Sequence, residues 1–275
     1  MKFIQRRGSV ARRAGYACAF ALLAAVVSVG SQDGKAAILP VVTPVAACTD
    51  LLKIDFTGLE GAPTKLDSAV VVEPSAAVPT EQCVVTGYVA SKVKFTVWMP
   101  TKTWTQRLLM KGCGGYCGNL IAPTPTTYDV GGNSGAGVGC PFVPSGELAI
   151  AAHNGGHTGN TNSGRFLAAI ADGMWAIEDS TSLIDFFYAA NHKATVAAKA
   201  VINAFYGRNP TYSYFDGCSS GGRAALHEAQ RFPKDYNGIL AGLPHDRQHL
   251  REYLPSFVEC SRQLQTQWHI NLDRG

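Results

Sequence analysis

Alternating polar and apolar side chains predict a pair of neighbouring antiparallel strands in the first half of the chain. They span residues 83–89 and 92–100, and the alternation is typical of strands with one buried face. Two shorter and mostly apolar segments, residues 107–111 and 147–152, predict further strands, the second of them buried. The pattern in this half of the chain therefore predicts a β-sheet made of these four strands.

A long helix is predicted later in the chain, over residues 184–202. Its apolar side chains recur at intervals of three and four residues, which is typical of a helix packed on one face of a sheet. Ala197, Val201 and Phe205 are expected to face inward. Gly207 is expected to close the helix, because glycine readily adopts the left-handed conformation that follows a helix C-terminus.

Strands and helices alternate in the remaining pattern. An aromatic run at residues 212–216 predicts a strand, a short glycine- and serine-rich sequence follows it, and helix formers begin directly afterwards. Residues 238–242 predict the next parallel strand. The order strand, helix, strand, helix, strand indicates a doubly wound α/β fold with a mostly parallel sheet.

The composition is that of a globular protein, and the first residues have the pattern of an export signal. The chain has 275 residues, of which 46% are hydrophobic and 16% charged, which suits one large domain and argues against disorder. In residues 1–31 a basic segment precedes an apolar run that ends in small residues, and this predicts a secretory signal peptide. The apolar run is short for a spanning helix, so a membrane anchor is the less favoured alternative.

Removal of the signal peptide changes the charge of the protein. The formal net charge falls from +4 to about −1, because five basic residues leave with it: Lys2, Arg6, Arg7, Arg12 and Arg13. Nothing then indicates a nucleic-acid partner, and no membrane contact is expected after cleavage. The mature protein is expected to be secreted or periplasmic.

Cysteine usage agrees with export, since an oxidising compartment favours disulfides. Of the eight cysteines, Cys18 leaves with the signal peptide, so an odd number remains and one should lack a partner. A Cys48–Cys83 disulfide is favoured over lipidation of Cys48. Cys113 and Cys117 could ligate a metal, but no convincing second ligand pair follows at zinc spacing, so no metal site is expected.

The sequence Gly217-Cys218-Ser219-Ser220-Gly221 is the first indication of chemistry, because it fits the pattern G-x-S-x-G. Between a strand and a helix, this pattern predicts a nucleophile elbow, a sharp turn that holds a serine at strained backbone angles. We therefore expect Ser219 to be a catalytic nucleophile rather than a residue of an ordinary loop. The N–H of Ser220, at the helix start, is expected to face a developing oxyanion.

The sequence around this elbow resembles a known family. Residues 217–223 and then 228–242 are similar to the tannase and feruloyl esterase family of α/β-hydrolases. The resemblance implies a serine hydrolase of carboxylic esters that forms an acyl-enzyme. It also implies small aromatic esters of the hydroxybenzoate or hydroxycinnamate type as substrates.

The resemblance also implies a domain organisation. A linker at residues 32–44 is expected to lead into an α/β-hydrolase core at residues 45–243, and residues 244–275 resemble the start of the family's lid domain, within which the chain ends. In the family, the triad acid and histidine follow the lid, and the calcium site belongs to the part of the lid that comes after residue 275. All are expected beyond residue 275, so no cofactor is assigned. An inactive remnant or a binding module is the alternative function.

The same resemblance implies a role for Cys218, which matches a cysteine bonded to one beside the catalytic histidine. Its partner is therefore expected to be missing from this chain.

A glycine-rich loop at residues 112–118 follows the strand at 107–111 and is expected to complete the oxyanion hole. Backbone N–H groups can surround an alkoxide only where no side chain blocks them. A phosphate-binding loop would need a Gly-Lys-Ser/Thr ending, which the sequence lacks, and a plain hairpin turn is the other alternative. We expect Gly114 or Gly115 to provide one donor and Ser220 the other.

Histidines elsewhere are not expected to be the base. His157 follows the strand at 147–152 and is expected to brace its loop, where Asn154 occupies a position that is acidic in the family. His192 and His227 lie on predicted helices and are expected to have no catalytic role.

Overall fold

The computed structural model describes residues 39–75, 78–118, 120, 147–157, 174–176 and 179–242. The predicted signal peptide and the predicted lid segment lie outside these residues. The described elements, in chain order, are η1 (Cys48–Lys53), β1 (Thr64–Val72), β2 (Gln82–Val89), β3 (Val93–Pro100), β4 (Arg107–Lys111), β5 (Ala149–His153), η3 (Met174–Ala176), α2 (Ser180–Ile184), η4 (Asp185–Ala189), α3 (Ala190–Tyr206), β6 (Tyr212–Cys218), α4 (Ser220–Arg231) and β7 (Gly238–Gly242).

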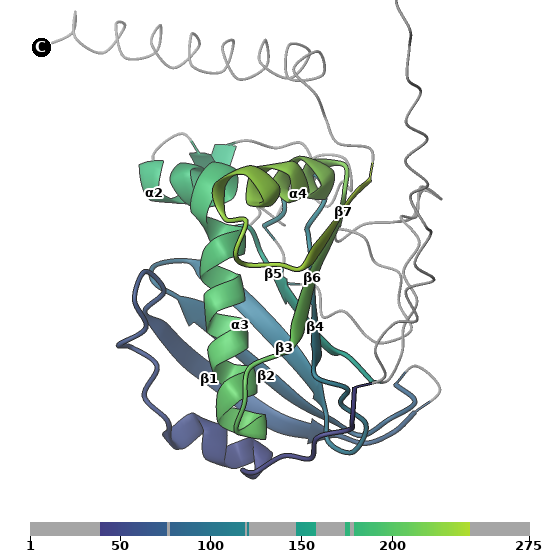
Figure 1. Ribbon diagram of the computed structural model, residues 1–275. Coiled ribbons are helices and arrows are strands. Elements are labelled where there is room, and N and C mark those ends of the chain that lie inside the picture. Colours follow the sequence, from purple (N-terminus) through teal and green to yellow (C-terminus); the bar gives the residue numbers. More distant parts are fainter. Residues whose placement is uncertain are drawn as a thin grey trace, which may run out of the picture. The chain divides into compact units, whose positions relative to one another are not determined.

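The strands form a seven-stranded sheet in the order β1-β2-β3-β5-β4-β6-β7 (Figure 1). The predicted antiparallel pair is confirmed as β2 and β3, with Gly87 opposite Phe95. β5 pairs antiparallel with β3 and parallel with β4, and β6 lies parallel between β4 and β7. The sheet is thus antiparallel on one side and parallel on the other, and the predicted α/β fold class is confirmed.

β1 is a strand that the sequence pattern did not predict. It pairs antiparallel with β2, but the register shifts between Leu66 and Ser68, as in a β-bulge. An extra residue in a strand reverses the alternation of its side chains. Thr64 and Ala69, the buried residues on either side of the shift, are consequently an odd number of positions apart, so no simple alternation marks this strand.

The helix predicted over residues 184–202 is interrupted near its start. It begins as α2, widens into the π-helical turn η4 and continues as α3. At η4 the buried Asp185 lies so close to Gly156 that a Cβ on that glycine would stand 2.4 Å from the Cβ of Asp185. As predicted, Gly207 ends the helix with φ 72°, and its N–H donates to the Asn203 carbonyl at 2.8 Å.

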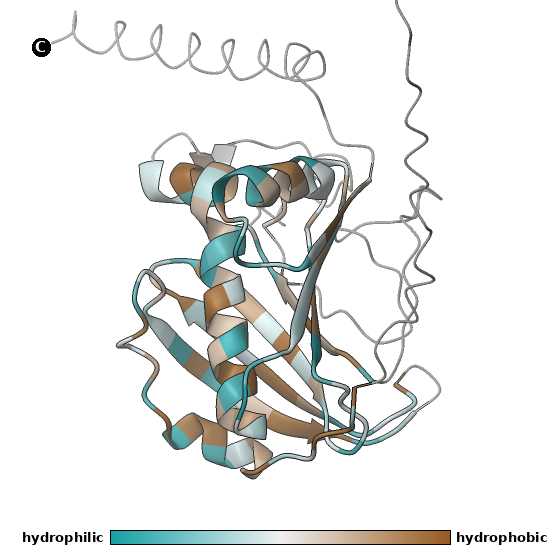
Figure 2. Cartoon of the chain, in the orientation of Figure 1, coloured by the Kyte–Doolittle hydropathy of each residue, from teal (hydrophilic) through white to brown (hydrophobic). Residues whose placement is uncertain are grey.

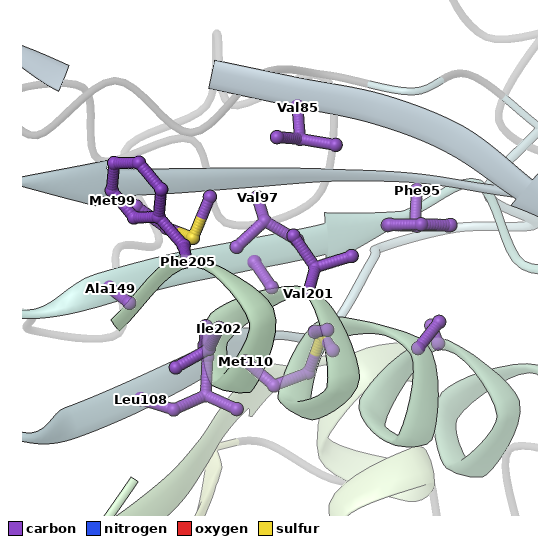
Figure 3. Packing of buried hydrophobic residues seen from close by; sticks show 14 of the residues in the cluster. Val85, Phe95, Val97, Met99, Leu108, Met110, Ala149, Val201, Ile202 and Phe205 are labelled. Carbon is purple, nitrogen blue, oxygen red and sulfur yellow. The ribbon is translucent and has the colours of Figure 1, made fainter. Parts of the chain in front are cut away.

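The core lies between α3 and the sheet. Ala197, Val201 and Phe205 are buried as predicted, and Figure 3 shows Val201, Ile202 and Phe205 among side chains of several strands. Figure 2 shows hydrophobic and hydrophilic residues alternating along α3, as expected of a helix with one buried face. The strand residues of this cluster include Val85, Phe95, Val97, Met99, Leu108 and Met110.

The end of the predicted linker is attached to the domain. Val42 donates its N–H to the Trp104 carbonyl at 2.9 Å, and the Gln106 side-chain amide donates to the Pro40 carbonyl at 2.8 Å. These bonds fix residues that composition alone indicated as linker. Among the described residues, no helix is both long and apolar enough to span a bilayer.

Glu228, on α4, is a buried carboxyl in the core. Within the described residues, neither of its carboxyl oxygens forms a hydrogen bond. Burial raises the pKa of Glu228 to about 8, with the Asp235 carboxylate adding to this effect and Lys199 opposing it. In the unfolded chain a glutamate has a pKa of about 4.3. Between these values the folded protein holds a proton that the unfolded chain has released, so its stability falls as pH rises.

The variant Glu228→Gln should therefore gain stability chiefly at high pH. We expect its free energy of unfolding to exceed that of the parent by about 3 kcal/mol at pH 9 and to match it near pH 4.5. Urea unfolding at both pH values measures this, with Glu60→Gln, at an exposed glutamate, as control. An equal gain at both pH values would contradict the raised pKa.

Candidate functional site

Ser219 occupies a sharp turn between β6 and α4, as the sequence predicted. Its backbone angles are φ 59° and ψ −121°, in a region that residues other than glycine rarely occupy. Hydrogen bonds on both sides hold it there, because its N–H donates to the Gly242 carbonyl and its carbonyl accepts from Arg223 N, both at 3.0 Å. The elbow is therefore built from β6, α4 and β7 together.

Glycines at the elbow allow the backbone segments of the turn, of α4 and of the glycine loop to pack in direct contact. A Cβ on Gly217 would stand 2.3 Å from the Gly221 carbonyl oxygen, so no larger residue fits while the turn keeps this shape. A Cβ on Gly112 would lie 3.1 Å from the Cα atoms of both Gly217 and Gly221. The glycine loop that follows β4 is thereby packed against the elbow.

Gly114 and Gly115 lie in this loop, beside the start of α4. Gly115 has φ 56°, and Cys117 N donates to the Gly114 carbonyl at 3.0 Å, which closes a tight turn. Within the described part of the chain, the N–H groups of Gly114 and Gly115 donate to no other group. The N–H of Ser220, in the first turn of α4, has no intrahelical acceptor. These three N–H groups are the candidate oxyanion donors.

A buried ion pair stands directly before both loops. Lys111 Nζ donates to Asp216 Oδ2, and both side chains are almost fully buried. The two residues are register partners on β4 and β6, and Gly112 N also donates to the Asp216 carbonyl at 2.8 Å. The pair thus ties the two strands where their loops leave the sheet. Sequence reasoning missed this pair, although Lys111 is the last residue of β4 and Asp216 lies near the end of β6.

The loop after β5 supports the glycine loop from its other side. Gly118 N donates to the Asn154 carbonyl at 2.8 Å, and His157 Nε2 donates to the Tyr116 carbonyl. The Asn154 side chain accepts from Gly156 N at 3.0 Å and donates to the His157 carbonyl at 2.7 Å. The His157 ring stacks on Trp175 at 3.6 Å. These contacts fit the bracing role expected of His157.

His153 is a buried histidine that the sequence reading passed over. Its Nδ1 accepts from Gly155 N at 3.0 Å, so the neutral ring places its proton on Nε2, which donates to Asn191 Oδ1 at 2.6 Å. Burial lowers the pKa of His153 to about 4, with the Asn191 hydrogen bond acting against this shift. His153 is therefore neutral near pH 7 and joins β5 to α3.

The histidines on α3 and α4 have partners of their own. His192 Nδ1 lies 2.6 Å from Asp235 Oδ2, and its ring stacks on Phe232 at 4.1 Å. His227 packs edge-on against Tyr188 at 5.3 Å. These contacts fit the structural roles expected of both residues.

The disulfides confirm one expectation, exclude one disfavoured alternative and correct one expectation. The predicted Cys48–Cys83 bond is present, but Cys113 and Cys117 are bonded to each other, so the weighed alternative of metal ligation at this pair is wrong. Among the described residues, no cluster of potential ligands could hold a metal.

Cys218 is also disulfide-bonded, so the expectation that this chain holds no partner for it is wrong. Since the other described cysteines pair among themselves, its partner lies outside the described residues. The expectation took the partner from the family's order and passed over the chain's own remaining cysteines.

Most of the described core is similar in sequence to known proteins. A family model for tannase and feruloyl esterase matches residues 77–257. The mono(2-hydroxyethyl) terephthalate hydrolase of Piscinibacter sakaiensis is 35% identical over 188 residues, covering 65% of this chain and 29% of that protein. A probable feruloyl esterase B-2 of Aspergillus flavus is 33% identical over 198 residues, covering 69% of this chain and 33% of that protein.

The fold also has a solved counterpart. Feruloyl esterase B from Aspergillus oryzae matches with a TM-score of 0.52 at 23% identity, over 72% of this chain and 38% of that chain. At this identity the likeness concerns the fold alone. The chain spans 29% and 33% of the length of the two sequence relatives. Because the family model matches more than half of the chain, this chain belongs to the tannase and feruloyl esterase family.

Proposed function

We propose that the protein is a secreted serine hydrolase that cleaves carboxylic esters of aromatic acids. The observation that carries this proposal is the strained Ser219, held between β6 and α4 and packed beside a glycine loop whose Gly114 and Gly115 N–H groups have no acceptor among the described residues. A serine at a helix start beside backbone N–H groups that can serve as oxyanion donors suits acyl transfer.

The chemistry would run in two steps. Ser219 Oγ attacks the ester carbonyl, and its proton passes through a general base to the departing alcohol. The carbonyl oxygen carries the negative charge of the tetrahedral intermediate and receives hydrogen bonds from the Ser220 N–H and from Gly114 or Gly115. Water then attacks the acyl-enzyme, releasing the acid and restoring Ser219. The base is expected outside the described residues.

Substrate class and compartment rest on separate observations. The two relatives are named for esters of terephthalic and ferulic acids, both aromatic, which supports an aromatic acyl group for this protein. Disulfides at Cys48–Cys83 and Cys113–Cys117 support a protein made for an oxidising compartment, in agreement with the predicted signal peptide.

A substrate panel tests the proposal. The product of the full open reading frame is incubated with methyl ferulate, methyl gallate, mono(2-hydroxyethyl) terephthalate and, as an aliphatic control, ethyl butyrate, and the acids are measured by chromatography. We expect kcat/KM for one aromatic ester to exceed that for ethyl butyrate by about 100-fold or more. Preference for the aliphatic ester would refute the aromatic assignment, and no cleavage of any ester would refute the activity.

A further inference from the structure

We propose that the Cys113–Cys117 disulfide is a positioning device for the oxyanion donors, holding Gly114 and Gly115 in the shape that the reaction requires. This inference rests on the proposed ester hydrolysis and adds to it two residues that act through the backbone of their neighbours.

The disulfide closes a small ring that contains both candidate donors. Cys113 and Cys117 are four positions apart, with their Cα atoms 5.4 Å from each other, and Gly114 and Gly115 lie between them. Cys117 has φ 59°, which is unfavourable for a residue with a Cβ. Within the ring, the hydrogen bond from Cys117 N to the Gly114 carbonyl is the local restraint besides the disulfide. The disulfide therefore stabilises a turn whose backbone conformation, with positive φ at Cys117, is unfavourable without it.

The first end of the ring is anchored on the elbow. A Cβ on Gly221 would stand 3.1 Å from the Cys113 carbonyl oxygen, so Cys113 packs directly against the first turn of α4. The preceding Gly112 donates its N–H to the carbonyl of Asp216 on β6, the strand that leads into Ser219. Cys113 is thus fixed relative to the nucleophile.

The other end is anchored on the loop that follows β5. A Cβ on Gly155 would stand 2.7 Å from the Cβ of Cys117 and 3.0 Å from its sulfur. Gly118 N and the Tyr116 carbonyl bind Asn154 and His157 of that loop. The disulfide therefore connects a point on the elbow to a point on the β5 loop, with the donors in between.

Loss of this bond should affect the reaction more than substrate binding. Oxyanion donors must lie about 2.7–3.1 Å from the developing charge, so a small displacement weakens the transition state. Substrate contacts made elsewhere are unchanged, so kcat should fall while KM stays. The chain offers a matched control, because Cys48–Cys83 encloses a separation of 35 residues and lies in the core cluster.

Two double variants of the full-length protein test the inference. For Cys113→Ala with Cys117→Ala we expect kcat to fall about 10- to 100-fold with KM within about twofold. The inhibition constant of an aryl trifluoromethyl ketone, whose serine adduct carries an oxyanion, should rise by the same factor, while that of the aromatic acid product should not change. Cys48→Ala with Cys83→Ala should lower Tm more, because stabilisation grows with the length enclosed, and should leave kcat unchanged.

Each result decides the inference. An unchanged kcat, or a change in KM alone, for the Cys113 and Cys117 variant would overturn it. If that variant does not fold, Cys113→Ser with Cys117→Gly takes its place, since glycine adopts positive φ without strain. Failure of the proposed function is distinguishable, because in that case the parent protein would show no hydrolysis or would keep it in Ser219→Ala.

Discussion

Replacement of Ser219 by alanine should lower kcat for ester hydrolysis by about 10⁴-fold or more. The change removes the only atom that forms the acyl-enzyme and leaves the oxyanion donors in place. The substrate's KM should change little, because ground-state contacts do not require the hydroxyl.

Ser213→Ala is the control for this variant, since Ser213 is a buried serine on β6, the strand that leads into the turn of Ser219. It should keep the parent kcat within about twofold, because surrounding structure is disturbed little by removal of one hydroxyl. Initial rates with the best aromatic ester measure both variants. Hydrolysis by Ser219→Ala near the parent rate would show that another residue is the nucleophile.

Gly217→Ala should be the most destabilising single methyl addition at the elbow. The new Cβ would meet the Gly221 carbonyl oxygen at 2.3 Å and the Gly221 carbonyl carbon at 2.5 Å, both backbone atoms that cannot move without shifting α4. Overpacking of this kind costs about 3 kcal/mol. Because the shift falls on the turn that carries Ser219, activity should be lost as well.

Gly58→Ala is the matched comparison for this glycine. A Cβ at Gly58 would have no atom within 4 Å, so its free energy of unfolding should stay within about 0.5 kcal/mol of the parent. Urea unfolding of both variants measures the difference. Equal stability of the two variants would mean that β6 and α4 are not packed as closely as described.

The elbow could be predicted from sequence because its determinants are local. Glycines on both sides of Ser219, an aromatic strand before it and helix formers after it all lie in one short segment. The β2–β3 pair and the closure of α3 by Gly207 were predictable for the same reason. Strand alternation and C-terminal glycines are short-range signals.

Features that depend on contacts between distant segments were missed or misjudged. β1 was not predicted because its bulge breaks the alternation of its side chains. The sequence also gives no sign of the π-helical turn η4 or of the close approach between Asp185 and Gly156. The Lys111–Asp216 pair joins residues 105 positions apart, so nothing local to either residue in the sequence indicates the other. Such contacts follow from the topology, which periodicity alone does not specify.

The Cys113–Cys117 pair was open for a different reason. The lack of a second ligand pair disfavoured metal ligation, but the sequence did not indicate which cysteine each of the two bonds, and the structure shows that they bond each other. The closeness of this loop to the elbow is what gives the disulfide its proposed role. This closeness could not be inferred from the sequence, because it depends on where Gly112 and Gly221 lie in the fold.

The central claim is that Ser219 is an activated nucleophile, and labelling with a fluorophosphonate tests it most directly. The full-length protein is treated with the probe, digested and mapped by mass spectrometry, with Ser219→Ala in parallel. We predict one modified peptide containing phosphonylated Ser219 in the parent and none in the variant. Labelling at another serine, or none in the parent, would contradict the assignment of Ser219.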